Sequence, residues 1–237
     1  MLQPIQEFAE GKVLLIDKPI DWTSFDVVAK IRGLIRIPKV GHAGTLDPLA
    51  TGLLIICTGK FTKNINEYMK MEKEYTGSFT MGATTPTYDL ESEPENLKPY
   101  DHLTIETING LIKEKFLGEL KQIPPMFSAI KKDGQPLYLA ARKGITLEVE
   151  PRNINIIEFE ITKMELPIVN FRIVCTTGTY IRSIAQDIGQ ALGCGAFLSS
   201  LCRTRIGTFL NADAISVKAF EEDIRNRRAA AKQNASE

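Results

Sequence analysis

Residues 41–52, GHAGTLDPLATG, form the most unusual stretch of this 237-residue chain. Three glycines in twelve residues permit positive φ angles and close backbone approach. Pro48 disfavours a helical conformation at Asp47, so we expect that carboxylate at a fixed loop position. The segment lacks the Gly-Lys-Ser/Thr ending of a phosphate-binding loop. The simplest alternative is a plain turn, because Asp-Pro beside glycines is common turn chemistry.

The segments around this loop have the periodicities of helices and strands. Residues 11–17 predict a buried strand, and residues 24–35 have apolar positions spaced for one helical face, with Ser24 as the N-cap. Residues 53–58 predict an apolar strand, and residues 73–81 alternate as a half-buried strand. The order around Asp47 is therefore strand, helix, loop, strand.

The second half of the chain continues with long strands and helices. The expected helices are 104–116, 179–192 and 216–228, and the expected strands are 154–166, 168–176 and 203–210. Two long strands separated by one residue must form a hairpin, which favours an α+β fold over a parallel doubly wound sheet. Residues 123–151, rich in proline, glycine and basic side chains, predict a protruding insertion with a short helix at 137–142.

The composition is that of a globular protein without a metal site. Hydrophobic residues make up 43%, and no apolar run approaches the roughly 20 residues of a membrane-spanning helix. The first ten residues are polar and acidic, unlike a secretory signal, so we expect a cytoplasmic protein. Four cysteines without a Cys-x-x-Cys pair, and only two histidines, predict neither a zinc site nor a disulfide framework. Cys57 and Cys175 lie in apolar runs and are expected to be buried thiols.

The charge balance argues against an obvious nucleic-acid binder. Lysine plus arginine and aspartate plus glutamate both number 29, which gives a formal net charge of zero. Scattered solvated charge is the simplest interpretation, but a local basic face could still bind phosphates. In that case the acidic loop around Glu91 to Glu95 should lie away from the bound phosphates. The basic residues expected on the face of Asp47 are Lys63, Lys131, Lys132, Arg142, Lys143 and Arg203.

A second unusual segment is residues 176–189, TTGTYIRSIAQDIG, where a strand ends in glycine and a helix opens. The first turn of that helix carries Tyr180 and Arg182. An arginine there can pair with a carboxylate on a neighbouring loop, keep it ionised and fix its orientation. The residues alone also allow a surface Arg182 and a core Tyr180.

Residues 41–54 resemble the signature loop of the TruB-type bacterial tRNA pseudouridine-55 synthases. Four further blocks agree in order: Asp17-Lys18-Pro19 with Thr23-Ser24, Lys73-Glu74-Tyr75, residues 122–142, and GTYIRS at residues 178–183. The likeness spans about residues 11–210. It implies the α+β pseudouridine synthase fold, with a central mixed, mainly antiparallel sheet flanked by helices and an inserted loop that closes over RNA.

The resemblance also implies roles for individual residues. Asp47 matches the catalytic aspartate of the family, Arg182 the arginine that pairs with it, and Tyr75 the tyrosine that stacks on the flipped uracil. His42 matches a histidine that fills the space left by the flipped base. The implied substrate-binding residues are His42, Tyr75, Tyr180, Leu201, Lys131 and Arg142.

The implied activity is an isomerisation of uridine 55 in the T-loop of tRNAs to pseudouridine. The uridine flips into a pocket, its C1′–N1 bond breaks beside a carboxylate, and the base rejoins through C5. This reaction needs no cofactor and no metal. The expected partner is the T-arm stem-loop, not DNA or a membrane, and the expected state is a monomer. The alternatives are a non-catalytic tRNA-folding module that uses the same pocket, and a glycosidase, for which the signature loop offers one carboxylate and not two.

The chain departs from the family pattern at three places. Cys202 stands where arginine is common, and Asp21 stands where glycine is usual. Many members continue into a C-terminal RNA-binding module of the PUA type. We expect here a catalytic domain at residues 1–210, with its insertion at about 123–151, and only a helix and tail at residues 211–237.

Overall fold

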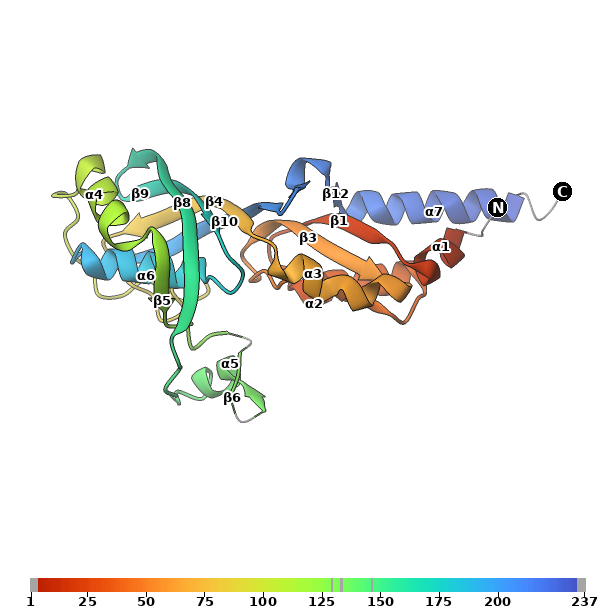
Figure 1. The fold of residues 1–237 in the computed structure, drawn as a ribbon, viewed down its shortest axis with the longest axis horizontal. Coiled ribbons are helices and arrows are strands. Elements are labelled where there is room, and N and C mark those ends of the chain that lie inside the picture. Colours follow the sequence, from red (N-terminus) through yellow and green to blue (C-terminus); the bar gives the residue numbers. More distant parts are fainter. Residues whose placement is uncertain (1–3, 129, 133, 146, 234–237) are drawn as a thin grey trace. The chain divides into compact units, whose positions relative to one another are not determined.

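The computed structural model describes residues 4–128, 130–132, 134–145 and 147–233. The chain divides into two compact units: Met1–Glu74 with Cys202–Glu237, and Tyr75–Leu201. Each unit has its own strands and helices (Figure 1). The first unit is therefore assembled from both ends of the chain.

The first unit is a small sheet covered by helices. Its strands are β1 (Val13–Lys18), β2 (Val40–His42), β3 (Thr51–Thr58), the end of β10 (Ala196–Ile206), β11 (Phe209–Leu210) and β12 (Ile215–Ser216). Its helices are α1 (Pro4–Glu10), α2 (Ser24–Ile35), α3 (Ile65–Lys70) and α7 (Val217–Gln233), with 3-10 turns at Gly59–Asn64 and Asn211–Asp213. The strand order is β12-β1-β3-β10, with β2 on β3 and β11 on β10.

Strand β3 is buried on both of its faces, which explains its continuous apolar sequence. Leu54 and Ile56 pack into a cluster with α1, α2 and α7. Leu53, Ile55 and Cys57 point the other way, against Ile206 and the apolar side chains of α3. The strand that leads out of residues 41–52 is thus the centre of the first unit.

The second unit has the strand order β10-β4-β9-β8-β5. Its elements are β4 (Lys73–Met81), α4 (Ile105–Lys115), β5 (Gly118–Gln122), β6 (Lys131–Lys132), β7 (Gln135–Pro136), α5 (Leu137–Ala141), β8 (Arg152–Glu165), β9 (Ile168–Cys175) and α6 (Ile181–Ala191). Phe79 of β4 and Phe171 of β9 stack with their ring centroids 4.2 Å apart. Phe159 of β8 meets both rings edge to face, so three strands share one aromatic core.

The pairing confirms a mixed and mainly antiparallel sheet. β1–β12 and β3–β10 are parallel, whereas β1–β3, β2–β3, β5–β8 and β8–β9 are antiparallel. The expected hairpin of residues 154–166 and 168–176 is present as β8 and β9. Cys57 and Cys175 are buried, as expected.

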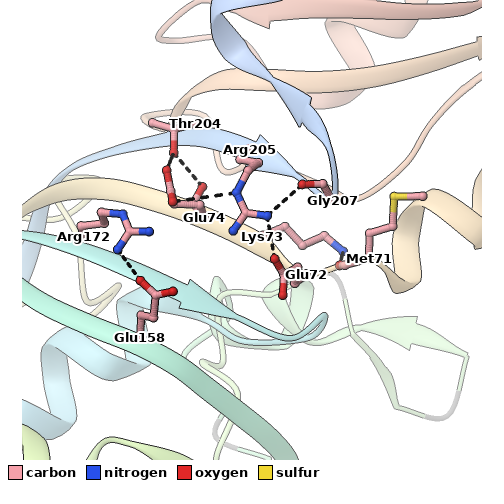
Figure 2. A network of polar contacts seen from close by, with 9 residues as sticks. All are labelled: Met71, Glu72, Lys73, Glu74, Glu158, Arg172, Thr204, Arg205 and Gly207. Carbon is pink, nitrogen blue, oxygen red and sulfur yellow. Dashed lines mark hydrogen bonds and ion pairs between the residues drawn. The ribbon is translucent and has the colours of Figure 1, made fainter.

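Strands β4 and β10 are linked by a polar network at the edge of the first unit (Figure 2). Arg205 pairs with Glu72 at 2.6 Å and Glu74 at 3.9 Å, and it donates to the carbonyl of Gly207. Thr204 donates to the Glu74 carboxylate at 2.8 Å. In the second unit the same view shows Arg172 of β9 pairing with Glu158 of β8. The Arg205 and Thr204 contacts fix the strand register next to Tyr75 in the sequence.

Several helices and strands differ from those expected from the sequence. The N-cap of α2 is Thr23 and not Ser24, because Thr23 and Asp26 form a reciprocal capping box. The final strand begins at Ala196 and is broken by the turn before β11, so the expectation of one strand at 203–210 is wrong. Helix α7 runs to Gln233, beyond the expected end at 228, and the polar residues of Pro4–Glu10 form a helix that was not expected from the sequence.

Candidate active site

Asp47 lies in the loop between β2 and β3 and is half buried. The Asp47 carbonyl accepts a hydrogen bond from Ala50 N at 3.1 Å, which closes a turn around Pro48 and Leu49. The turn expected from Asp-Pro is therefore present. What distinguishes it from an ordinary surface turn is the set of buried side chains that hold it.

Lys18 is the first of these side chains and has no exposed surface. Its ammonium donates to the carbonyls of Pro19 at 2.8 Å, Trp22 at 2.5 Å and Pro48 at 3.1 Å. The Pro48 carbonyl also accepts from the backbone N–H of Asp21 at 3.0 Å. Burial lowers the pKa of Lys18 to about 8, while the nearby carboxylate of Asp47 raises it. At pH 7 Lys18 is thus mostly a cation that fixes the residue after Asp47.

Asp21 takes the backbone conformation that brings its N–H to this carbonyl. Its φ is +65°, in the left-handed region that favours glycine and that aspartate tolerates better than most residues. This conformation gives a physical reason why glycine would suit the position.

Ser24 holds the residue before Asp47. Its hydroxyl accepts from the N–H of Leu46 at 2.8 Å and donates to the carbonyl of the same residue at 3.2 Å. Ser24 is therefore employed in the loop, and this explains why the adjacent Thr23 caps the helix. Both peptide neighbours of Asp47 are fixed by buried side chains.

Arg203 holds both arms of the loop from inside the first unit. It is 1% exposed, and its guanidinium donates to the carbonyls of Leu53 at 2.8 Å and Gly44 at 3.1 Å. The expectation that Arg203 contributes to an RNA-facing basic surface is therefore wrong, because its guanidinium is buried against backbone carbonyls. Arg203 is instead a positioning residue for the Asp47 loop.

His42 ends β2 and is neutral at physiological pH. Burial lowers the pKa of its imidazole, and the cation of Arg203 lowers it further. Its Nδ1 atom is buried and has no hydrogen-bond partner among the residues that the structure describes.

Arg182 lies at the start of α6 in the second unit and is 4% exposed. Its Nε pairs with the Asp89 carboxylate at 3.5 Å, and both side chains are buried. The guanidinium also donates to the carbonyls of Thr87 at 3.1 Å and Phe127 at 3.0 Å. The possibility that Arg182 is a surface arginine is wrong, because its guanidinium is held inside the second unit in a fixed orientation.

The other expected site residues belong to the second unit, whereas Asp47 and His42 belong to the first. Tyr75 and Leu201 are the residues at which the second unit begins and ends, and Tyr75 is 8% exposed. Tyr180 is the N-cap of α6. Lys131 lies in β6, but its side chain is outside the described part of the structure; Arg142 is exposed and stacks over the ring of Tyr138 at 5.5 Å.

Sequence reasoning missed the partners of these residues. Lys18 and Ser24 stood in motifs of the family, yet nothing in their spacing indicated bonds to the Asp47 loop. In the sequence, Asp89 was one of several acidic residues in a polar loop. In the structure it is buried, at 4% exposure. The one available signal was a lysine at the end of an apolar strand. A charge is rarely buried without a partner, so a lysine at such a position indicates that it has partners.

In the described part of the chain, no helix is both long and apolar enough to cross a membrane. Nor do the described His, Cys, Asp and Glu side chains include a group of three or more that could hold a metal ion.

Most of the chain is similar to known proteins. Residues 32–181 match the family described as TruB family pseudouridylate synthase (N terminal domain). Residues 182–234 match the one described as tRNA pseudouridylate synthase B C-terminal domain. The chain is 53% identical to a tRNA pseudouridine synthase B of Flavobacterium johnsoniae, over 92% of this chain and 98% of that protein. It is 49% identical to a tRNA pseudouridine synthase B of Phocaeicola vulgatus, over 91% and 94%.

The fold has a solved counterpart in a crystal structure of a Cbf5-Nop10-Gar1 complex. That chain superposes with a TM-score of 0.72 and is 30% identical. The match covers 92% of this chain and 56% of that one, so this chain spans about half of its solved counterpart.

Proposed function

The chain belongs to the TruB family of pseudouridylate synthases, and we propose that it isomerises uridine 55 in the T-loop of tRNAs to pseudouridine. The observation that carries this proposal is the fixation of Asp47. Lys18 and Ser24 hold its two peptide neighbours, and Arg203 holds both arms of the loop. Simple RNA binding does not require a carboxylate to be held so rigidly, whereas catalysis does.

The reaction assigns a task to each part of the site. The uridine leaves the loop and enters the pocket, where the ring of Tyr75 stacks on the base and Tyr180 and Leu201 line the walls. The Asp47 carboxylate meets the positive charge that develops on the ribose as the C1′–N1 bond breaks. The base turns and bonds to C1′ through C5. C5 then loses its hydrogen as a proton and N1 takes up a proton, so that product and substrate are isomers. Arg182 orients Asp47, and His42 takes the space that the base has left.

Asp89 belongs to this scheme because it fixes Arg182. A buried guanidinium held by three acceptors cannot swing away as the substrate enters, so its charge is in place before the reaction begins. Removing one partner of a buried ion pair typically costs about 3–5 kcal/mol, so the pair also supports the fold of the second unit.

Tritium release tests the activity. Purified protein should release tritium from tRNA labelled at C5 of uridine, and chemical mapping should place the product at position 55. Labelled tRNA that is bound but releases no tritium would favour the alternative of a non-catalytic tRNA-folding module.

The proposed substrate is the T arm, and an isolated T-arm stem-loop should therefore react. The motivating feature is local recognition, since a loop shape and a flipped base are both present in the isolated arm. An inert stem-loop beside a reactive full-length tRNA would show that the protein needs contacts outside the arm. We further propose that the enzyme acts as a cytoplasmic monomer, which sedimentation in the presence and absence of tRNA would test.

A further inference from the structure

The first turn of α6 is attached to the start of the insertion by a side chain to which neither the resemblance nor the proposed mechanism gives a role. Gln122 ends β5, is 3% exposed and pairs in the sheet with Arg152 of β8. Its side-chain nitrogen Nε2 donates to the carbonyl of Tyr180 at 3.0 Å, and its Oε1 accepts from the Tyr180 N–H at 2.8 Å. One carboxamide therefore satisfies both backbone groups of one residue.

The geometry of Tyr180 makes this two-point contact possible. Its φ of −99° and ψ of 109° are those of an extended residue, whose N–H and carbonyl point to the same side. The Tyr180 carbonyl also accepts the first bond of α6, from Ile184 N at 3.2 Å. The backbone of Tyr180 is thus held at both ends, which fixes the direction in which its side chain leaves the chain.

Two further bonds join the same segments. The hydroxyl of Ser183 donates to the carbonyl of Ile123 at 3.0 Å, and Arg182 donates to the carbonyl of Phe127. Ser183 is 2% exposed, so loss of this bond would leave a buried hydroxyl without that partner, which is costly. Residues 122–127 therefore form an anchored base at the start of the insertion, bonded to the turn that carries Tyr180 and Arg182.

We propose that Gln122 is a positioning residue for the reaction, setting Tyr180 and the base of the insertion in one arrangement. The inference rests on the proposed function. The contact needs a group that donates and accepts at once on the same side chain. A carboxamide meets this requirement, whereas an ionised carboxylate would place a second negative oxygen against the Tyr180 carbonyl.

The first experiment compares Gln122→Met with wild type in single-turnover kinetics on a T-arm stem-loop. Methionine keeps the length of the side chain and removes both bonds, so the rate at saturation should fall about tenfold or more, with a smaller change in the half-saturating concentration. The control is Thr104→Ala, which removes the N-cap of α4 in the same unit and should lower stability modestly. Thr104→Ala should keep the wild-type rate.

The second experiment separates positioning from general stability. In a double-mutant cycle, Gln122→Met should cost much less in a Tyr180→Ala background, because the ring that it positions is already gone. Gln122→Glu should recover activity relative to wild type as the pH is lowered, because a neutral carboxyl can donate to the Tyr180 carbonyl. Gln122→Met should show no such recovery.

The outcomes distinguish this inference from the proposed function. A wild-type enzyme that forms pseudouridine, together with a Gln122→Met variant that keeps its rate or is strictly additive with Tyr180→Ala, would overturn the role of Gln122 alone. A wild-type protein that forms no product on any tRNA would overturn both. A rate loss with coupling and pH recovery would establish Gln122 as part of the machinery.

Discussion

The charge of Asp47 is the property on which the proposed chemistry depends. Asp47→Asn keeps the size of the side chain and its place in the turn but removes the charge. We expect no measurable product from this variant, while tRNA binding stays within about tenfold, or roughly 1.4 kcal/mol, of wild type. Tritium release and filter binding measure the two quantities separately. Product formed at a rate near that of wild type would remove Asp47 from the mechanism.

The buried ammonium of Lys18 reports on the same carboxylate. Burial holds its pKa at about 8, and the Asp47 carboxylate raises it, so Asp47→Asn should lower the pKa of Lys18 further. Titration of the lysine ε-carbon signals by NMR measures the shift. The control is Asp223→Asn, in an aspartate that pairs with Arg227 on α7 and should leave Lys18 unchanged.

The lowered pKa of Lys18 also determines how the free energy of unfolding changes with pH. Between about pH 8 and 10.5 the unfolded chain holds the Lys18 proton and the folded chain releases it. The unfolded state then binds more protons, so the Lys18 contribution to the free energy of unfolding rises with pH across this window. A fall in that contribution, measured as wild type minus Lys18→Met in urea titrations, would contradict the depressed pKa.

At the scale of elements, periodicity located most helices and strands but placed their ends poorly. Strand β4 and helix α4 have strong patterns and appear where expected, within one residue. The start of β10 was missed because Ser199 and Ser200 interrupt its apolar pattern; their hydroxyls instead bond to Ser78 across the sheet. The cap of α2 was misplaced because Ser24 serves a loop distant in sequence, which local propensity cannot register.

The junction of the Asp47 loop with β3 depends on the glycine at position 52. Gly52 has a φ of +97°, and an added Cβ would lie 2.4 Å from the backbone oxygen of Arg203. Gly52→Ala should therefore lower the free energy of unfolding by about 1–3 kcal/mol from backbone strain alone, with the clash in addition. Gly33 lies in α2 with no atom within 4 Å of the added Cβ, so Gly33→Ala should raise it by about 0.5–1 kcal/mol. Urea denaturation of both variants tests the contrast.

At the scale of the whole molecule, the sequence indicated the candidate site residues better than the contacts that hold them. Asp47, Tyr75 and Arg182 stand in recognisable motifs. Their supports are single side chains whose partners lie far along the chain, 150 residues away for Arg203 and Leu53 and 58 for Gln122 and Tyr180. No local pattern encodes such pairs, because they arise only when the fold brings the segments together.

A protein of zero net charge must bind RNA through local positive charge. Arg142 and Lys143 lie in the insertion and are both exposed, and replacing both by glutamine should weaken RNA binding. The log–log salt dependence should flatten by about 0.7–0.9 for each phosphate that the variant no longer neutralises. The matched control replaces exposed Lys113 and Lys115 of α4, with the same change in charge. Equal slopes for the two double variants would favour dispersed, solvated charge over an RNA-binding insertion.

The hydrogen bonds from Arg203 to the carbonyls of Leu53 and Gly44 join segments that the ribosome synthesises at different times. The ribosome synthesises the Asp47 loop early. It adds Arg203 only after the whole second unit has been translated. At a translation rate of about 5–20 residues per second, Arg203 is added on the order of ten seconds after the loop that it holds. A nascent chain that stalls before residue 203 therefore carries every residue of its signature loop but lacks the side chain that holds it.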